Sequence, residues 1–334
     1  MFLPKCLITK NLVMLIFLIF LNVKLGGTRH GKRQLHHAVL NERPIIGVLT
    51  QSTQRFFPLD EMGNNYIPAS YVKFVESSGA RVVPIFNNFT KTELRRLFES
   101  INGAVFPGGK VNLFTSKYAR TAKYIFEFAR EAYDRGEYFP IIGMCLGHQL
   151  LATIINGARV DPRIPTNTTN ITAPLNLPKN YYDTKIFRHL PKYLAKDANM
   201  TEVAGHFHEY SLPADYFHAS VVLNEFYRIV TSNIIDGHEI VSTLEGRKYP
   251  FYGFQWHPEK PPFEWNSHKT IPHSSTAIKM SHYVSDFFVN EAKRSTHKFP
   301  SEEEERRALI SNFNPVFTIG LDPNATFSQV YFFD

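Results

Sequence analysis

Apolar and polar positions follow a regular order over the first half of the chain. Short apolar runs, which predict strands, alternate with segments whose apolar residues recur every three or four positions, which predict helices. We expect strands over residues 45–50, 81–86, 103–107 and 139–144, and helices over 66–78, 91–100, 118–133 and 146–156. Strands and helices alternating at these lengths predict an α/β fold in three layers, with a mostly parallel sheet covered by helices on both faces.

The second half of the chain is less regular. Residues 157–200 are rich in Pro, Asn and Thr and have no clean period, so we expect a long excursion or flap there. We expect strands over 217–229, 239–244, 249–256 and 330–334, and helices over 276–292 and from Ser301 onward. The glutamates at 302–305 follow this capping serine and favour a solvated helix start over a metal site.

The N-terminal segment differs in kind from the rest. Lys5 and Lys10 precede an apolar run over residues 12–21, and Gly27 lies shortly after it. This order predicts a secretory signal peptide over residues 1–27, with a weak cleavage site near Gly27. A signal anchor that stays in the membrane is the alternative, but the run is well short of the roughly 20 residues that a spanning helix needs.

This interpretation sets the domain organisation and the charge. It gives a signal peptide over 1–27, a basic leader over 28–43 and one domain over 44–334, in a secreted or lysosomal protein with no membrane segment after processing. Residues 1–27 hold three lysines and no acidic residue, so their removal lowers the net charge by three, from +7 to +4. No Lys/Arg cluster interleaved with aromatic residues follows, and nucleic acid is therefore not an expected partner.

The cysteine content is more informative than the charge. The chain has two cysteines, and Cys6 lies inside the expected signal peptide. A mature secreted chain therefore holds Cys145 alone, without a partner for an intramolecular disulfide. A buried, inert thiol is the commonest fate of a free cysteine, so the local sequence has to decide between that and a reactive thiol.

The residues around Cys145 suit a nucleophile. Gly143-x-Cys145-x-Gly147 joins an apolar strand to a helix, and the small flanking residues let the backbone turn sharply. The turn places Cys145 at a helix N-terminus, where the macrodipole and free N–H groups favour the thiolate, the nucleophilic form. The context therefore favours a reactive cysteine.

Partners for this thiol occur at the ends of other predicted strands. A thiolate that attacks a carbonyl needs a base, a group that orients the base, and donors for the oxyanion. His257 follows a strand, and Glu259 can hold its imidazole; the alternative for a lone histidine is a surface or satisfied core side chain. Gly108-Gly109 also ends a strand, and we expect the N–H groups of Gly109 and Leu146 to be the oxyanion donors.

A histidine pair offers a rival site. His206-x-His208-Glu209 could be a metal cluster, but no further ligand motif accompanies it, so we expect no metal and a supporting or substrate-contacting role for His208. No Gly-x-Ser-x-Gly, Walker or dinucleotide fingerprint occurs, so serine hydrolysis and phosphate chemistry are unsupported.

Asn-x-Ser/Thr sequons are slightly more frequent than chance. About three would occur at this composition. The chain has five, at Asn88, Asn167, Asn170, Asn199 and Asn324. We expect a glycosylated surface, with Asn167 and Asn170 in the irregular segment as the best acceptors.

The motifs resemble those of a known superfamily and, more narrowly, of one family. Gly143-Met-Cys-Leu-Gly-His-Gln149, Phe106-Pro-Gly-Gly109 and His257-Pro-Glu259 resemble the class I glutamine amidotransferases, whose Cys-His-Glu triad cleaves a glutamine-type amide. The wider sequence resembles the gamma-glutamyl hydrolase family of folate-polyglutamate hydrolases from about Pro44 to the C-terminus. The segments that carry this likeness are 43–49, 69–73, 78–84, 100–103, 255–260, 264–265 and 288–292.

The resemblance implies a fold, an activity and roles for residues. It implies a class I glutamine amidotransferase-like fold with a flavodoxin-like core, and cleavage of gamma-glutamyl bonds in folate polyglutamates through a thioester. Cys145 would be the nucleophile, His257 the base and then the acid, Glu259 its orienting carboxylate, and His208 an auxiliary histidine. It also implies a homodimer, a small-molecule substrate and no cofactor.

Three residues depart from the family pattern. Met144, His148 and Gln149 stand where the family usually has Thr, an aromatic residue and Glu, and His148-Gln149 is the amidotransferase form. A glutaminase module that feeds a synthase, and an inactive secreted binding protein on the same scaffold, are the alternative functions. Lys260 and Lys110 are candidates for holding the substrate carboxylates.

Overall fold

The computed structural model describes residues 40–53, 62–157, 160–322 and 325–334. These residues belong to the second of the chain's two units, Val39–Asp334, whereas the first unit, Met1–Ala38, falls outside them. The expected signal peptide, Cys6, most of the basic leader and the sequon at Asn324 therefore lie outside the described residues.

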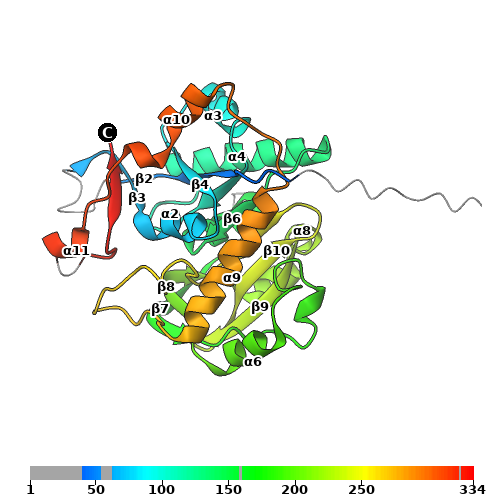
Figure 1. Cartoon of the computed structure of the whole chain (residues 1–334). Coiled ribbons are helices and arrows are strands. Elements are labelled where there is room, and N and C mark those ends of the chain that lie inside the picture. Colours follow the sequence, from blue (N-terminus) through cyan, green and yellow to red (C-terminus); the bar gives the residue numbers. More distant parts are fainter. Residues whose placement is uncertain (1–39, 54–61, 158–159, 323–324) are drawn as a thin grey trace, which may run out of the picture. The chain divides into compact units, whose positions relative to one another are not determined.

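A seven-stranded sheet in the order β4-β1-β5-β6-β11-β10-β9 runs through the second unit (Figure 1). The strands are β4 (Arg81–Ile85), β1 (Ile45–Leu49), β5 (Gly103–Phe106), β6 (Ile141–Met144), β11 (Phe251–Phe254), β10 (His238–Gly246) and β9 (Tyr227–Ile235). The first five are parallel to one another, and β10 and β9 are antiparallel additions. Counted along the chain, the parallel strands have the order 2-1-3-4-5 of flavodoxin-like folds. The expected mostly parallel sheet is confirmed.

Helices cover both faces of this sheet (Figure 1). One layer holds α2 (Ala69–Glu76) and α9 (Ser275–Ala292), with α6 (Lys192–Met200) packed on α9; the other holds α3 (Lys91–Phe98), α4 (Lys117–Asp134) and α5 (Leu146–Asn156). In β1, Ile46 and Val48 belong to the first core, whereas Ile45 and Leu49 belong to the second. Because alternate residues of a strand point to opposite faces, a strand buried on both faces is apolar throughout. The three layers are as expected.

Serine and threonine caps begin four helices where the sequence predicted a start. Thr90 caps α3 in a capping box with Glu93, and Ser116, Ser274 and Ser301 cap α4, α9 and α10 (Glu302–Ala308). Each hydroxyl accepts a hydrogen bond from the backbone N–H three residues later, a donor with no partner inside the helix. These local bonds explain why the helix starts were readable from sequence.

Smaller elements surround the main sheet. One three-stranded sheet pairs β12 (Val330–Phe333), β3 (Asn65–Pro68) and β2 (Gln51–Ser52), and a hairpin pairs β7 (Ile164–Ala173) with β8 (Ala204–Ser211). Short helices are η2 (Tyr181–Asp183), α7 (Ala214–Ala219), α8 (Val221–Phe226), η3 (Ile310–Asn312) and α11 (Thr318–Leu321). No helix within the described ranges has both the length and the apolar character needed to cross a membrane.

Three segments differ from the sequence prediction. Residues 157–200 hold β7 and α6 instead of an irregular excursion. No sign of β7 is visible in the sequence because two of its buried positions are Thr166 and Thr168, which produce no apolar period. Residues 217–226 belong to α7 and α8, apart from Ser220 between them, and the strand begins only at Tyr227. Residues 66–68, expected to be helical, form β3 because they pair with β12 near the C-terminus. Long-range pairing of this kind overrides local preference.

Candidate active site

Cys145 lies in the turn between β6 and α5, at the carboxyl edge of the sheet. Its backbone has φ 52° and ψ −105°, a conformation that non-glycine residues adopt only where the surroundings hold it. The Cys145 N–H donates to the carbonyl of Phe254 at 2.7 Å, which ties the turn to β11. This is the sharp strand-to-helix turn that the sequence predicted.

Two glycines let the chain make this turn. A Cβ on Gly143 would lie 2.5 Å from the backbone of Gly147. A Cβ on Gly147 would lie 2.0 Å from the carbonyl oxygen of Phe106 in β5. Because both contacts are with backbone atoms, a larger residue at either position would push α5 away from the sheet.

A histidine and a glutamate complete a buried triad with this thiol. His257 Nδ1 lies 2.6 Å from Glu259 Oε1, and His257 also hydrogen-bonds the thiol of Cys145. Burial lowers the pKa of His257, but the charges of Glu259 and Cys145 and their hydrogen bonds outweigh burial and raise it to about 9. Burial raises the pKa of Glu259, but His257 lowers it below its ordinary value. The geometry therefore favours an imidazolium held by a carboxylate.

The glycine pair after β5 lies against the thiol. A Cβ on Gly108 would lie 3.1 Å from Cys145 Cβ. The Gly108 N–H donates to the hydroxyl of Tyr71 at 2.8 Å, so this donor is already used. Leu146 is the first residue of α5, and its N–H has no acceptor within the helix. Gly109 and Leu146 line the same cavity as the thiol.

A cavity of about 710 Å³ opens over Cys145. It lies beyond the carboxyl ends of β5, β6 and β11, where open α/β sheets bind their ligands. Its lining combines cations with aromatic rings: Lys110, Arg163, Lys260, Lys269, Phe114, Phe207, Tyr210 and Phe327. Such a lining suits an anionic substrate with apolar or aromatic parts.

Lys260 differs from the other cations of this cavity. The residue is only 5% exposed, and its Nζ lies over the rings of Phe207 and Phe327, 5.8 Å and 4.7 Å from their centroids. Among the described residues it has no ion pair. Lys110, by contrast, has a side chain that is 78% exposed and pairs with Glu209 at 2.6 Å. Because buried lysines are rare unless they are paired, Lys260 is a candidate for binding an anionic group of a ligand.

His208 lies in the wall of the cavity with both ring nitrogens engaged. Its Nδ1 is 2.6 Å from Thr168 Oγ1, and its Nε2 is 3.0 Å from His206 Nδ1. Burial, followed by the neighbouring His206 and His257, lowers the pKa of His208 well below 6.5, so the ring is neutral near pH 7. In the part of the chain that the structure describes, no group of three His, Cys, Asp or Glu residues is placed to hold a metal.

The two amidotransferase-like residues after the elbow have different surroundings. His148 is 0% exposed and absent from the cavity lining; burial lowers its pKa to about 4. Gln149 does line the cavity, and its Oε1 accepts a hydrogen bond from Arg163 Nη1 at 2.9 Å. Position 148 is therefore a packing position, whereas position 149 can influence the ligand.

Several residues at the site were not found from sequence. Arg163 lies in the segment without a period, and Tyr71 and Gln51 come from elements far from the elbow. Tyr71 accepts the N–H of Gly108, and Gln51 Nε2 donates to the Gly108 carbonyl. Only the approach of separate segments in the fold identifies these residues.

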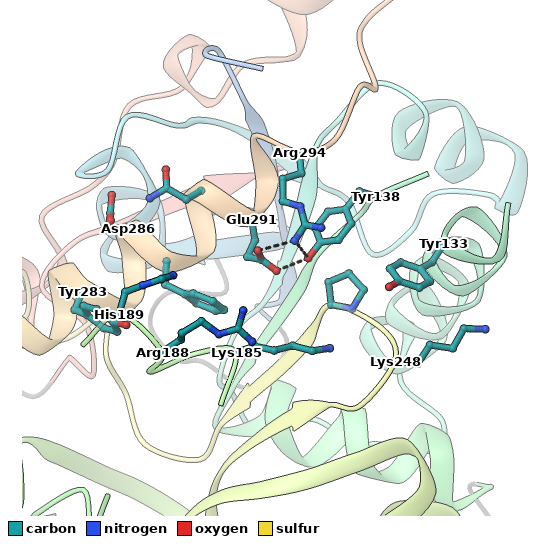
Figure 2. Close-up of a pocket in the computed structure, with 13 residues that line it drawn as sticks. Tyr133, Tyr138, Lys185, Arg188, His189, Lys248, Tyr283, Asp286, Glu291 and Arg294 are labelled. Atoms are coloured by element: carbon teal, nitrogen blue, oxygen red, sulfur yellow. Dashed lines mark hydrogen bonds and ion pairs between the residues drawn. The ribbon is translucent and has the colours of Figure 1, made fainter. Parts of the chain in front are cut away.

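A second cavity of about 450 Å³ lies at the other end of the same strands (Figure 2). Tyr138 precedes β6 and Pro250 precedes β11, so this cavity opens at their amino ends, away from Cys145. Glu291 accepts hydrogen bonds there from the hydroxyl of Tyr138 and from Arg294 Nη1. Its lining contains no cysteine, serine or threonine, and hydrolysis by such a nucleophile is not supported there.

The fold and the triad define the class of protein: a cysteine hydrolase of α/β architecture, with a cysteine, a histidine and a carboxylate at the carboxyl edge of a mostly parallel sheet. Residues 44–259 match the family model for Peptidase C26. The chain belongs to this family, that of the gamma-glutamyl hydrolases.

Individual relatives agree with this assignment. The chain is 39% identical over 298 residues to gamma-glutamyl hydrolase of Homo sapiens, covering 89% of this chain and 92% of that protein. It is 35% identical to gamma-glutamyl hydrolase B of Dictyostelium discoideum, covering 88% and 84% of the two chains. Among solved structures, the glutaminase domain of Trypanosoma brucei CTPS aligns with 76% of this chain and 96% of its own, at 15% identity and a TM-score of 0.48.

Proposed function

We propose that this chain hydrolyses the gamma-glutamyl bonds of folate poly-gamma-glutamates through a thioester acyl-enzyme. The observation that carries the proposal is the Cys145–His257–Glu259 triad at the floor of a cavity lined by cations. Family membership supports the hydrolase activity. The cations and aromatic rings of the cavity support a substrate with several carboxylates and an aromatic end.

In the first step the Cys145 thiolate attacks the side-chain carbonyl carbon of a gamma-linked glutamate. In this mechanism the N–H groups of Gly109 and Leu146 stabilise the oxyanion that forms, and both residues line the cavity. Because the pKa of His257 is raised to about 9, the imidazole holds a proton near neutral pH. The acid that the leaving nitrogen needs is therefore in place when the thiolate attacks.

The second step breaks the amide and then the thioester. His257 gives its proton to the leaving nitrogen as the C–N bond breaks, and the acyl group remains on the sulfur. Water then attacks the thioester, His257 takes a proton from it, and the C–S bond breaks. In both steps the hydrogen bond between His257 Nδ1 and Glu259 fixes the tautomer and the orientation of the imidazole. The leaving group is an amino acid or peptide, so no ammonia is passed on.

Gln149 does not turn the site into that of a glutaminase. Its Nε2 donates to the Tyr210 carbonyl at 2.6 Å and to Gln255 Oε1 at 3.1 Å. Its Oε1 accepts from Arg163. With these bonds the amide is part of the cavity wall, and the amidotransferase form of the sequence at 148–149 has a structural explanation here.

Product analysis on a defined pteroyl-polyglutamate tests the function. The wild-type chain should release glutamate or gamma-linked oligoglutamate, and free glutamine should be a far poorer substrate. Cys145→Ala should abolish turnover and keep the wild-type melting temperature. Undiminished turnover by this variant, or hydrolysis of glutamine without cleavage of the polyglutamate, would contradict the proposal.

The same proposal includes secretion or lysosomal delivery after removal of residues 1–27, glycosylation and a homodimeric state.

The sequons at Asn88, Asn167, Asn170 and Asn199 are all on exposed residues. The Asn199 amide exchanges hydrogen bonds with the Leu177 backbone at 2.8 and 3.0 Å, and Asn170 Oδ1 accepts from Thr270 N at 2.7 Å. Asn88 and Asn167 are therefore the best glycan acceptors. N-terminal sequencing, glycosidase treatment and light scattering of the secreted chain test the three parts.

A further inference from the structure

Gln149 links the helix that follows Cys145 to Arg163, a mostly buried arginine in the cavity wall. Gln149 lies one turn along α5 from Cys145. Its Nε2 is held by Tyr210 and Gln255, which fixes the direction of the amide. Its oxygen accepts from Arg163 Nη1 at 2.9 Å. The position of the guanidinium is therefore tied to the position of the thiol.

Arg163 is mostly but not fully buried, and only some of its N–H groups have acceptors. Its side chain is 11% exposed, and its guanidinium lies 4.9 Å from the centroid of the Tyr210 ring. Asp161 accepts from Nε at 2.8 Å and from Nη2 at 2.7 Å. Of the five N–H groups of a guanidinium, these bonds and the one to Gln149 use three. One N–H on each terminal nitrogen has no acceptor among the described residues.

Two unused N–H groups on one planar cation suit a carboxylate. Arginine binds carboxylates through pairs of parallel N–H donors, and such charge-assisted bonds are stronger where water is excluded. Arg163 lines the cavity that contains Cys145. Asp161 covers the Nε and Nη2 edge, so the unused donors lie elsewhere on the guanidinium.

Arg163 and Lys260 serve different parts of a substrate. Lys260 lies over Phe207, whose ring is 5.7 Å from that of His257, the group that gives its proton to the leaving nitrogen. Arg163 lies over Tyr210, about 10 Å farther along β8. Lys260 is therefore on the side of the leaving group, whereas Arg163, bound to the helix of the nucleophile, is on the side of the acyl group.

We propose that Arg163, held by Gln149 and Asp161, binds the α-carboxylate of the glutamyl residue whose gamma-carbonyl is attacked. The inference rests on the proposed function and names the residue that recognises the acyl half of the substrate. It makes a free α-carboxylate on that residue a requirement for efficient cleavage.

A pair of substrates separates this role from a structural one. The parent is pteroyl-di-gamma-glutamate, which has one gamma bond between its two glutamates, and the analogue carries a carboxamide in place of the α-carboxylate of the inner glutamate. Wild-type kcat/KM should fall about 10- to 100-fold from parent to analogue. Arg163→Leu should lose a similar factor on the parent and much less on the analogue. Equal losses on both substrates would overturn the proposal.

Arg95→Leu is the matched control, because Arg95 forms an ion pair with Glu131 between α3 and α4 and does not line the cavity. Melting temperatures of all variants show whether each chain is folded. A wild-type chain that cleaves neither substrate would refute the proposed function, a different result from the equal losses that refute this inference.

Discussion

At the scale of single residues, the proposed mechanism makes His257 the group that sets the pH range of the reaction. Burial lowers its pKa, but Glu259 and Cys145 raise it to about 9. The imidazolium that protonates the leaving nitrogen is therefore lost as the pH rises through about 9, and kcat/KM should fall there. Of the groups that raise this pKa, Glu259 has the largest effect. Glu259→Gln removes its charge and keeps His257 buried, so the pKa of His257 should fall and the alkaline limb of the pH profile should move to lower pH. A pH profile of kcat/KM checks this, and an alkaline limb that stays in place would contradict the assignment.

Lys260 is the second residue whose chemistry predicts a measurable effect. Its buried ammonium has no ion pair among the described residues, so its charge is available to pair with an anionic group of the substrate. Lys260→Met should raise KM for a pteroyl-polyglutamate about 10- to 100-fold, the range expected for losing a charge-assisted hydrogen bond of roughly 1.5–3 kcal/mol.

Lys110→Met is the control for this variant. Lys110 also lines the cavity, but its side chain is 78% exposed and already pairs with Glu209. Exposed pairs contribute about 1 kcal/mol or less, so its steady-state KM should change by less than about fivefold. Equal effects of the two substitutions would show that general cationic charge, and not the buried position of Lys260, attracts the substrate.

At the scale of elements, the contact between α5 and β5 holds the nucleophile in place. A Cβ on Gly147 would lie 2.0 Å from the Phe106 carbonyl, so α5 must shift in Gly147→Ala. We expect the free energy of unfolding to fall by about 1–3 kcal/mol and kcat to fall strongly, because the thiol moves with the helix. Urea unfolding and steady-state kinetics measure the two effects.

The other end of α5 provides the control. Gly157 ends the helix with φ 89°, and a Cβ there would meet nothing within 4 Å. Gly157→Ala should therefore lower the free energy of unfolding only through backbone strain, by about 1–2 kcal/mol. Its kcat should stay close to that of the wild type. A similar loss of kcat in both variants would mean that stability of the helix, and not its distance from β5, controls the reaction.

At the scale of the whole molecule, the buried triad links folding to pH. The folded pKa of His257, about 9, lies above its ordinary 6.5. The contribution of this histidine to stability is therefore full below pH 6.5 and is lost as the pH rises from 6.5 through about 9. The difference in free energy of unfolding between the wild type and Glu259→Gln should shrink over this window, by roughly 2–3 kcal/mol. A difference that stays constant from pH 6 to pH 10 would contradict the linkage.

The sequence by itself determined the elements whose signals are local. Apolar periods located the parallel strands and the main helices, the cap at Ser301 located the start of α10, and Gly143 and Gly147 located the elbow. Each of these depends on bonds or contacts between near neighbours in the chain, or on burial of a strand on both faces. Cys145, His257 and Glu259 could be proposed for the same reason, since each follows a strand end.

Only the tertiary structure decided what depends on distant segments meeting. It turned residues 66–68 into a strand through pairing with β12, and it gave the threonine-rich β7 a partner in β8. It buried His148 against β11 while leaving Gln149 to hold Arg163 in the cavity wall. Packing between elements sets a side chain's hydrogen-bond partners and its access to a cavity. A local sequence pattern carries no information about this packing.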